Sequence, residues 1–127
     1  MIAVDTSALM AIVLKEPEAG ACAAALEIEG ELLISAGTVG EALIVSARRN
    51  VGEEMARIVD GLGFVIVPVT PAAARRIGAV YRRWGRGWHA AALNFGDCFA
   101  YDVAKQNDCR LLYIGDDFGK TDLESAL

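Results

Sequence analysis

The sequence predicts an α/β protein in which a parallel sheet lies between two layers of helices. Two observations lead to this prediction. Short, purely apolar runs recur along the chain, without the polar alternation of strands that have one face in water. Longer segments with apolar residues at three- and four-residue spacing separate them, which is typical of amphipathic helices. Strands that alternate with helices in this way form parallel sheets covered on both faces.

The composition is that of one compact domain. The chain has 127 residues, enough to bury a substantial core, and is 54% hydrophobic and 23% charged. We therefore treat residues 1–127 as a single domain. No apolar run is long enough to cross a bilayer, and the segment from Met1 to Leu14 contains Asp5 and has no basic start, so we do not interpret it as a signal peptide. Three cysteines without C-x-x-C spacing argue against disulfides or a zinc site and favour the cytoplasm.

The first elements follow from an apolar start and its flanking residues. A strand at residues 2–4 stops at Asp5-Thr6-Ser7, any of which can cap a helix over residues 8–14. Pro17 lies near the start of a second helix that continues through residues 21–28, since the first turn of a helix tolerates proline.

The middle of the chain repeats this order of elements. A second strand is predicted at residues 32–34, and a long helix follows from residue 35 or 36 to residue 49. Another helix covers residues 53–62. Residues 64–67 are the most β-like run of the chain, and the helix at residues 72–84 follows two prolines that mark the end of that strand.

The last third of the chain predicts a loop, two helices and a strand. Residues 85–89 are rich in glycine and form the loop. A helix begins near Asp97 and continues to about residue 106, and the fourth strand covers residues 111–114. The spacing Thr121-x-x-Glu124 resembles a capping box and predicts a short terminal helix.

Acidic residues occur where a parallel sheet gathers its ligands. Asp5 directly follows the first strand, and Asp116 follows the last strand after one glycine, so both are expected at the carboxyl edge of the sheet. Asp97 begins the helix that leads into the last strand. Glu41 interrupts an otherwise apolar helix segment.

Each of these acids also has a purely structural interpretation. Asp5 and Asp97 can cap helices, Glu41 can face solvent, and the pair Asp116-Asp117 can serve a turn. Taken together, acids that converge at one edge repel one another and need a cation. Hard divalent ions such as Mg²⁺ or Mn²⁺ prefer oxygen ligands, and such a site can polarise a phosphoryl group and activate water.

Positive charge is concentrated in one segment. Residues 71–96 contain five arginines and no acid, in a chain whose formal net charge is −5. Such a segment can hold a polyanion, or its arginines can form the solvated face of one helix. The candidates for contact with RNA are Arg82, Arg83, Arg86 and His89.

Several enzyme classes lack support in this chain. His89 is the single histidine, which excludes a metal-free ribonuclease with paired histidines. The chain has no G-x-S-x-G motif, no Walker lysine and no G-x-G-x-x-G after a strand.

Five motifs in order along the chain resemble those of a known family. They are Val4-Asp5-Thr6-Ser7-Ala8-Leu9, Ser35 to Ala42, Tyr81-Arg82-Arg83, Leu93 to Tyr101, and Gly115-Asp116-Asp117-Phe118 with Thr121-Asp122. On these residues the chain resembles PIN-domain ribonucleases of the VapC type, the toxins of bacterial and archaeal toxin–antitoxin systems. The match extends from the first residues to the last few.

This resemblance implies a fold and a set of site residues. The fold is a three-layer α/β/α PIN-like fold with a central, mainly parallel sheet of four to five strands, the fifth being missing or very short here. Asp5, Glu41 and Asp97 fall on the three principal acids that bind Mg²⁺ or Mn²⁺. The resemblance also implies Asp116 or Asp117 as a fourth acid. Thr6 and Ser7 fall where the family places a hydroxyl near the metal-bound water.

The resemblance also implies partners. Members of the family cleave tRNA or rRNA, usually as homodimers, and are inhibited by a VapB-type antitoxin. Two other interpretations stay open at this point. The chain could be a non-catalytic RNA- or protein-binding module that keeps the PIN fold. It could also be an aspartyl-phosphate protein, although Ser7 stands where one such family has a second aspartate.

Overall fold

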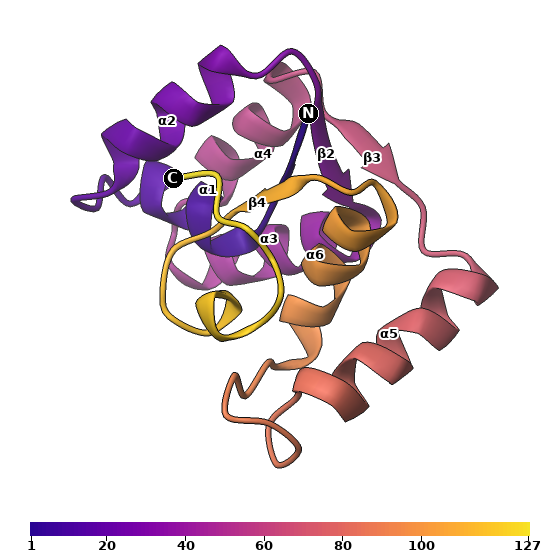
Figure 1. The fold of residues 1–127 in the computed structure, drawn as a ribbon. Coiled ribbons are helices and arrows are strands. Elements are labelled where there is room, and N and C mark those ends of the chain that lie inside the picture. Colours follow the sequence, from indigo (N-terminus) through magenta and orange to yellow (C-terminus); the bar gives the residue numbers. More distant parts are fainter.

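A four-stranded parallel sheet forms the middle layer of the molecule (Figure 1). The computed structural model describes all 127 residues. The strand order is β3-β2-β1-β4. β1 (Ile2–Val4) is central, between β2 (Leu32–Ser35) and β4 (Arg110–Leu112), and β3 (Val65–Val67) forms the edge beyond β2. Every pairing is parallel, as the uninterrupted apolar runs predict.

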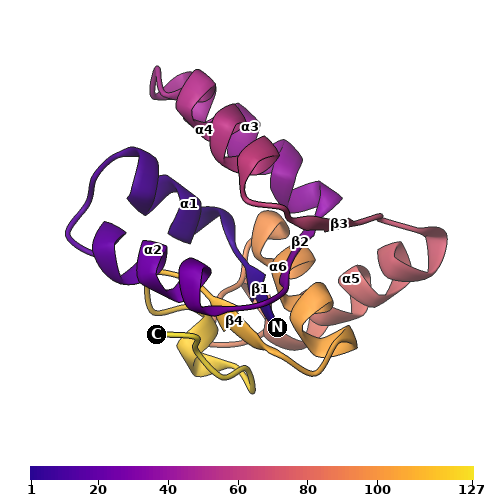
Figure 2. The same cartoon turned by 90° about the horizontal axis from the view of Figure 1, so that it is seen from above.

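Helices cover both faces of this sheet, which gives the expected three layers. α1 packs against α2, and α3 packs against α4 (Figure 2). These four helices share one hydrophobic core with the sheet, whereas α5 and α6 form a second core on the opposite face. The helices are α1 (Thr6–Val13), α2 (Ala19–Ile28), α3 (Ala36–Arg48), α4 (Gly52–Gly61), α5 (Pro71–Trp84) and α6 (Phe95–Gln106).

The strand order places a topological switch beside β1. The chain runs outward from β1 through β2 to β3 and then returns to place β4 on the other side of β1. Crevices outside the carboxyl ends of the strands at such a point are the usual ligand sites of open α/β sheets. The segments that leave β1 and β4 therefore define where a site is expected.

The fourth strand is shorter than the sequence predicts. It ends at Leu112, because the backbone N–H of Ile114 donates to Ser7 Oγ at 2.9 Å and not to a neighbouring strand. This bond fastens the chain after β4 to the first turn of α1.

The short terminal helix predicted from the Thr121-x-x-Glu124 spacing is wrong, because no helix begins at Thr121. A single 3₁₀ turn forms earlier, at Phe118–Lys120. Thr121 Oγ1 donates to the carbonyl oxygen of Phe118 at 2.6 Å and accepts from the N–H of Leu123 at 3.2 Å, so its hydroxyl closes a turn and caps no helix. Beyond it, Ser125 forms one isolated parallel bridge with Leu111, which is all that corresponds to a fifth strand.

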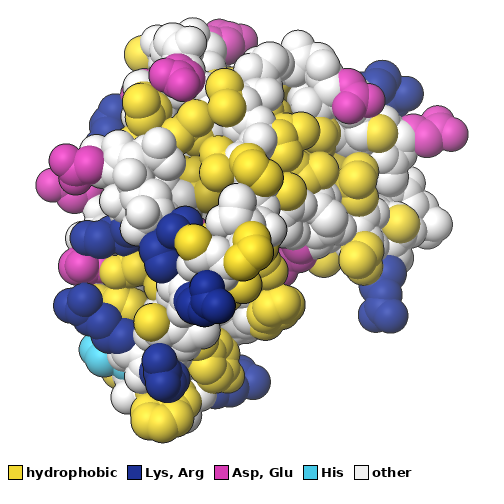
Figure 3. Space-filling view, turned by 90° about the vertical axis from the view of Figure 1, so that its right-hand side faces the viewer, with side chains coloured by type: hydrophobic (Ala, Val, Ile, Leu, Met, Phe, Trp, Pro, Cys, Tyr) yellow, Lys and Arg dark blue, Asp and Glu magenta, His cyan; other side chains and the backbone are white.

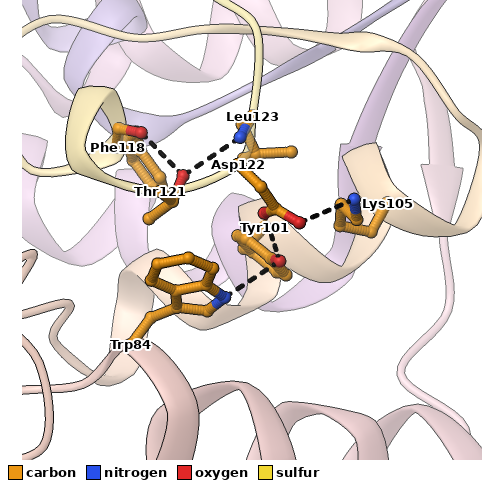
Figure 4. Close-up of polar contacts among 7 residues, drawn as sticks. All are labelled: Trp84, Tyr101, Lys105, Phe118, Thr121, Asp122 and Leu123. Atoms are coloured by element: carbon orange, nitrogen blue, oxygen red, sulfur yellow. Dashed lines mark hydrogen bonds and ion pairs between the residues drawn. The ribbon is translucent and has the colours of Figure 1, made fainter.

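A polar network fixes α6 between α5 and the C-terminal segment (Figure 4). Trp84 Nε1 donates to the hydroxyl of Tyr101 at 3.0 Å, and that hydroxyl donates to Asp122 Oδ1 at 2.6 Å. Lys105 Nζ binds the other oxygen of Asp122 at 3.0 Å. Burial, with the bond to Asp122, raises the pKa of Tyr101 to about 12, so its hydroxyl keeps its proton. The network holds the helix whose first turn carries Asp97.

Two further features bear on the sequence-based expectations. The three cysteines are unpaired: Cys22 and Cys98 are buried and Cys109 is partly buried. None of the helices combines the length and the apolar character needed to cross a bilayer.

Candidate active site

Asp5 occupies the carboxyl end of β1 and caps α1. Its Oδ2 accepts from the N–H of Ser7 at 3.0 Å and from Ser7 Oγ at 2.7 Å. The side chain is buried, with the residue 4% exposed, and its Oδ1 has no hydrogen-bond partner. Helix capping therefore accounts for one carboxylate oxygen and leaves the other buried and free, which is costly for a charged group.

Electrostatics around Asp5 disfavour its charged form. The pKa of Asp5 is raised to about 7, chiefly by burial and also by the charges of Asp97 and Glu41, against the lowering effect of the Ser7 bonds. The structure thus brings together Asp5, Glu41 and Asp97, the three acids on which the family resemblance falls. No basic side chain contributes to this shift.

Glu41 is held from two sides on α3. Thr6 Oγ1 donates to Glu41 Oε1 at 2.6 Å, which links the first turn of α1 to α3. A Cβ atom at Gly96 would overlap the Glu41 carboxylate, so that carboxylate lies against the first turn of α6. The side chain is half-buried, with its carboxylate bound by Thr6 and lying against Gly96, so the solvent-facing interpretation of Glu41 does not hold.

Asp97 both caps α6 and belongs to the acidic group. The helix begins at Phe95, with Asn94 as its N-cap, so Asp97 is the third helical residue. Asn94 Oδ1 accepts from the N–H of Asp97 at 2.8 Å, and Asp97 Oδ2 accepts from the N–H of Asn94 at 2.9 Å. Burial raises the pKa of Asp97, and the charges of Glu41 and Asp117 add to this. This reciprocal capping box, Asn94-x-x-Asp97, has a spacing that sequence inspection could have found.

The two candidates for a fourth acid are neighbours in the turn after β4. Asp116 and Asp117 are both exposed, and Gly115 before them has φ of +103°, which turns the chain away from the strand. Of the two, it is Asp117 whose charge contributes to the raised pKa of Asp97. The structure therefore favours Asp117 over Asp116 as the acid nearer the site.

Thr6 and Ser7 act through the carboxylates in this structure. Thr6 positions Glu41, while Ser7 donates to Asp5 and accepts from Ile114 at the end of β4. Each hydroxyl thereby connects a site acid to a second element of the fold. Their positions suit an orienting role toward the acids.

The acids fit a divalent cation by their chemistry. All donors are carboxylate oxygens, and the free Oδ1 of Asp5 is a buried acceptor without a donor. No group of three His, Cys, Asp or Glu side chains is close enough to enclose an ion as they stand. Asp5, Glu41 and Asp97 would therefore hold an ion only after their side chains turn toward one another.

The arginine segment divides into a paired and an exposed part. Arg76 Nε and NH2 bind the two oxygens of Asp102 at 2.8 and 3.0 Å, and Asp102 is 5% exposed. Asp102 is thus the buried partner of an ion pair. Arg75 and Arg82, in contrast, are exposed on α5.

The remaining candidates for RNA contact lie around Trp84. The guanidinium of Arg83 stands 4.7 Å from the centre of the Trp84 ring, and the His89 ring meets the same indole edge-on at 4.7 Å. His89 Nδ1 accepts from the N–H of Ala91 at 2.9 Å, so this ring nitrogen is used in a hydrogen bond within the loop. Arg86 is exposed in that loop. None of these residues contacts the acidic group.

Comparison with known proteins agrees with the geometry. The model of the PIN domain family matches residues 2–123. Ribonuclease VapC30 of Mycobacterium tuberculosis is 40% identical over 130 residues, covering 97% of this chain and 96% of that protein. Ribonuclease VapC of Mycolicibacterium smegmatis is 37% identical over 129 residues, with 97% and 98% covered.

Two solved structures share the fold. The crystal structure of Mycobacterium tuberculosis VapC20, titled a sarcin-ricin loop cleaving toxin, superposes with a TM-score of 0.80 at 17% identity, covering 97% of this chain and 96% of that one. A toxin-antitoxin complex from Klebsiella pneumoniae gives 0.73 at 17% identity, with 100% and 98% covered. The family model and the relatives together show that this chain belongs to the PIN-domain family, among the VapC ribonucleases.

Proposed function

We propose that this protein is a Mg²⁺- or Mn²⁺-dependent endoribonuclease that cleaves tRNA or rRNA and acts as the toxin of a VapBC-type pair. The observation that carries the proposal is the buried, unpartnered Oδ1 of Asp5 beside Glu41 and Asp97. Three carboxylates without a basic partner at the carboxyl edge of a parallel sheet need a cation. The relatives named ribonucleases supply the reaction class.

The acids and the two hydroxyl residues would have different roles in this reaction. Asp5, Glu41 and Asp97 would hold the ion, with Asp117 or Asp116 beside it. A divalent ion held there would polarise the phosphoryl group and activate water for hydrolysis. Ser7 fixes Oδ2 of Asp5 and so leaves Oδ1 free, while Thr6 fixes one oxygen of Glu41.

We propose that the exposed arginines bind the RNA backbone. The face that carries β3 and α5 shows Lys and Arg side chains gathered on its lower part and hydrophobic side chains above them (Figure 3). Arg82, Arg83, Arg86 and His89 belong to α5 and the loop after it. Contacts with phosphates through these residues predict an affinity that falls steeply with salt.

The partners would be a second copy and an antitoxin. Val65 and Ile66 of the edge strand are each 48% exposed, which suits a homodimer interface at that edge of the sheet. One of the structures with this fold is a toxin-antitoxin complex, which supports a VapB-type antitoxin as the inhibitor. We place this pair in the cytoplasm.

Cleavage of RNA by the purified protein tests the proposal. With Mn²⁺ or Mg²⁺ the wild type is expected to cut total tRNA and rRNA, and EDTA is expected to stop the reaction. Asp97→Asn should abolish cleavage, because an amide lacks the charge that binds the ion. Asp108→Asn, which changes an exposed acid outside the site, is the control and should cleave normally.

The other outcome would favour the second candidate function. Binding of RNA without cleavage at any metal concentration would support a non-catalytic module built on the exposed arginines. Cleavage that Asp97→Asn leaves intact would contradict the assignment of the site.

A further inference from the structure

An apolar groove lies directly beside the acidic group. It has a volume of about 490 Å³ and runs between α3 and the first turns of α6. Ile44 and Val45 form its α3 side, and Phe95 and Phe99 form its α6 side. Glu41, one of the three site acids, stands in the same wall. The groove is therefore continuous with the place where the acids meet.

Phe95 is an exposed aromatic residue at the start of α6. It is 66% exposed, although it lies two positions before Asp97 in a capped first turn. Its ring meets that of Phe99 edge-on, with centroids 4.9 Å apart and planes at 70°. The Phe99 ring in turn rests on Gly37 of α3, where any Cβ would overlap it. An uncovered aromatic face beside the acidic group suits stacking by a flat ligand.

Charge decides which part of a nucleotide this groove can take. None of its nine lining residues is basic, and Glu41 places a negative charge in its wall. A phosphodiester would meet repulsion there and find no donor of positive charge. The base is the uncharged, flat part of a nucleotide, and it is joined to the scissile phosphate through a single ribose. Gly40 leaves the groove open on its α3 side, because a Cβ there would meet nothing within 4 Å.

We propose that this groove binds one unpaired nucleobase of the RNA, stacked on Phe95. This base belongs to a nucleotide next to the scissile phosphate. The inference rests on the proposed ribonuclease function and makes it narrower: the substrate presents an unstacked base at the cleavage site. Recognition of RNA sequence commonly depends on such splayed bases of loops and bulges. The groove then sets the base preference of cleavage at one position.

A library of RNA hairpins with randomised loops tests the proposal. Sequencing of the cleaved ends gives the base preference at each position around the cut. The wild type is expected to show a preference at one nucleotide flanking the scissile phosphate, and Phe95→Ala to lose it there alone. Phe95→Trp, which keeps a stacking face, should retain it. Ile28→Ala removes another exposed apolar side chain, on α2, and serves as the control.

An abasic site in the best-cleaved loop provides the second measurement. In the wild type, removing that base is expected to lower kcat/KM about tenfold, as loss of one stacked base does. In Phe95→Ala the same removal should have no further effect, because the ring and the base act together. A base effect of equal size in wild type and variant would overturn the proposal.

Two further results distinguish a failure of the base subsite from a failure of the proposed ribonuclease function. If the wild type cuts the library and Phe95→Ala keeps the full base preference, the subsite is wrong and the ribonuclease stands. If the wild type does not cut RNA in any metal, both fall. A Phe95→Ala variant that changes its mass in sedimentation would show that a second copy covers the groove, which would also overturn the base subsite.

Discussion

Two aspartates of this fold are equally buried and have opposite surroundings. Asp5 is 4% exposed and Asp102 is 5% exposed. Both oxygens of Asp102 are bound by the guanidinium of Arg76. Asp5 binds only Ser7 through one oxygen, and its neighbours in charge are other acids.

The difference teaches which buried acid belongs to the structure and which to function. A buried carboxylate is tolerated when the chain supplies a cation with good hydrogen-bond geometry. The chain supplies one for Asp102 and none for Asp5. Burying the Asp5 carboxylate therefore costs free energy in the metal-free protein. We infer that a cation bound from solution offsets this cost.

The largest expected effect separates the two aspartates by activity. Asp5→Asn should lower RNA cleavage more than 100-fold, because loss of an ion ligand exceeds the roughly 10- to 100-fold effect of a supporting residue. Asp102→Asn should keep most of the activity, since Asp102 does not touch the site acids. Initial rates with Mn²⁺ measure both. Equal losses in the two variants would contradict the distinction.

The next effect concerns the position of Glu41 against α6. Gly96→Ala places a methyl group where the Glu41 carboxylate lies, so we expect a loss of about 10- to 100-fold in activity and in affinity for Mn²⁺. Glu41→Asp shortens the side chain and makes room. The double variant should therefore be more active than the product of the two single losses predicts.

Gly78 of α5 supplies the control for this experiment, because a Cβ there meets nothing within 4 Å. Gly78→Ala should leave both activity and Mn²⁺ affinity unchanged. Strictly multiplicative losses in the double variant would show that Gly96 and Glu41 do not act on each other.

A smaller effect is the pH dependence of the metal-free protein. The pKa of Asp5 is about 7 in the folded state, raised by burial above the ordinary 3.8. The folded state binds this proton more tightly, so the stabilisation from Asp5 is fully present below pH 3.8 and is lost as pH rises through about 7. The full loss is on the order of 4 kcal/mol in the free energy of unfolding.

Urea titrations in EDTA at pH 5 and pH 8 check this prediction. Asp5→Asn has no proton to release at this position, so its stability should fall less between the two pH values. A variant with the same pH slope as the wild type would place the titration elsewhere.

The smallest effect is on thermal stability. Without metal at pH 8, Asp102→Asn should lower Tm by about 5 °C, because it breaks the bidentate pair with Arg76. Asp5→Asn should not lower Tm, since it removes an unbalanced buried charge. Calorimetry in EDTA compares the two. A lower Tm for Asp5→Asn would mean that the charge of Asp5 stabilises the fold.

The sequence predicted those parts of the fold that local patterns determine. Apolar runs and their flanking caps placed all four strands and six helices, and the position of Asp5 directly after β1 follows from the chain itself. The terminal helix failed because the Thr121 hydroxyl has two possible uses, and the contacts of Phe118 and Leu123 selected the turn.

The acids of the candidate site could be named from the sequence and its family resemblance, whereas their contacts could not. The bond from Thr6 to Glu41 joins residues 35 positions apart, and Arg76 reaches Asp102 across 26 positions. Such pairs depend on how helices pack, which no local pattern encodes. The contact between the Glu41 carboxylate and Gly96 could not be predicted for the same reason. A glycine at this position is equally compatible with the opening of a turn.

Titration of the metal-free protein with Mn²⁺ tests the central claim most directly. Binding to the folded state alone raises Tm as the concentration of ligand exceeds its dissociation constant. We predict that Mn²⁺ raises the Tm of the wild type and of Asp102→Asn at pH 8, and leaves that of Asp5→Asn unchanged. A wild type that millimolar Mn²⁺ does not stabilise, or an Asp5→Asn variant stabilised as much as the wild type, would contradict the account.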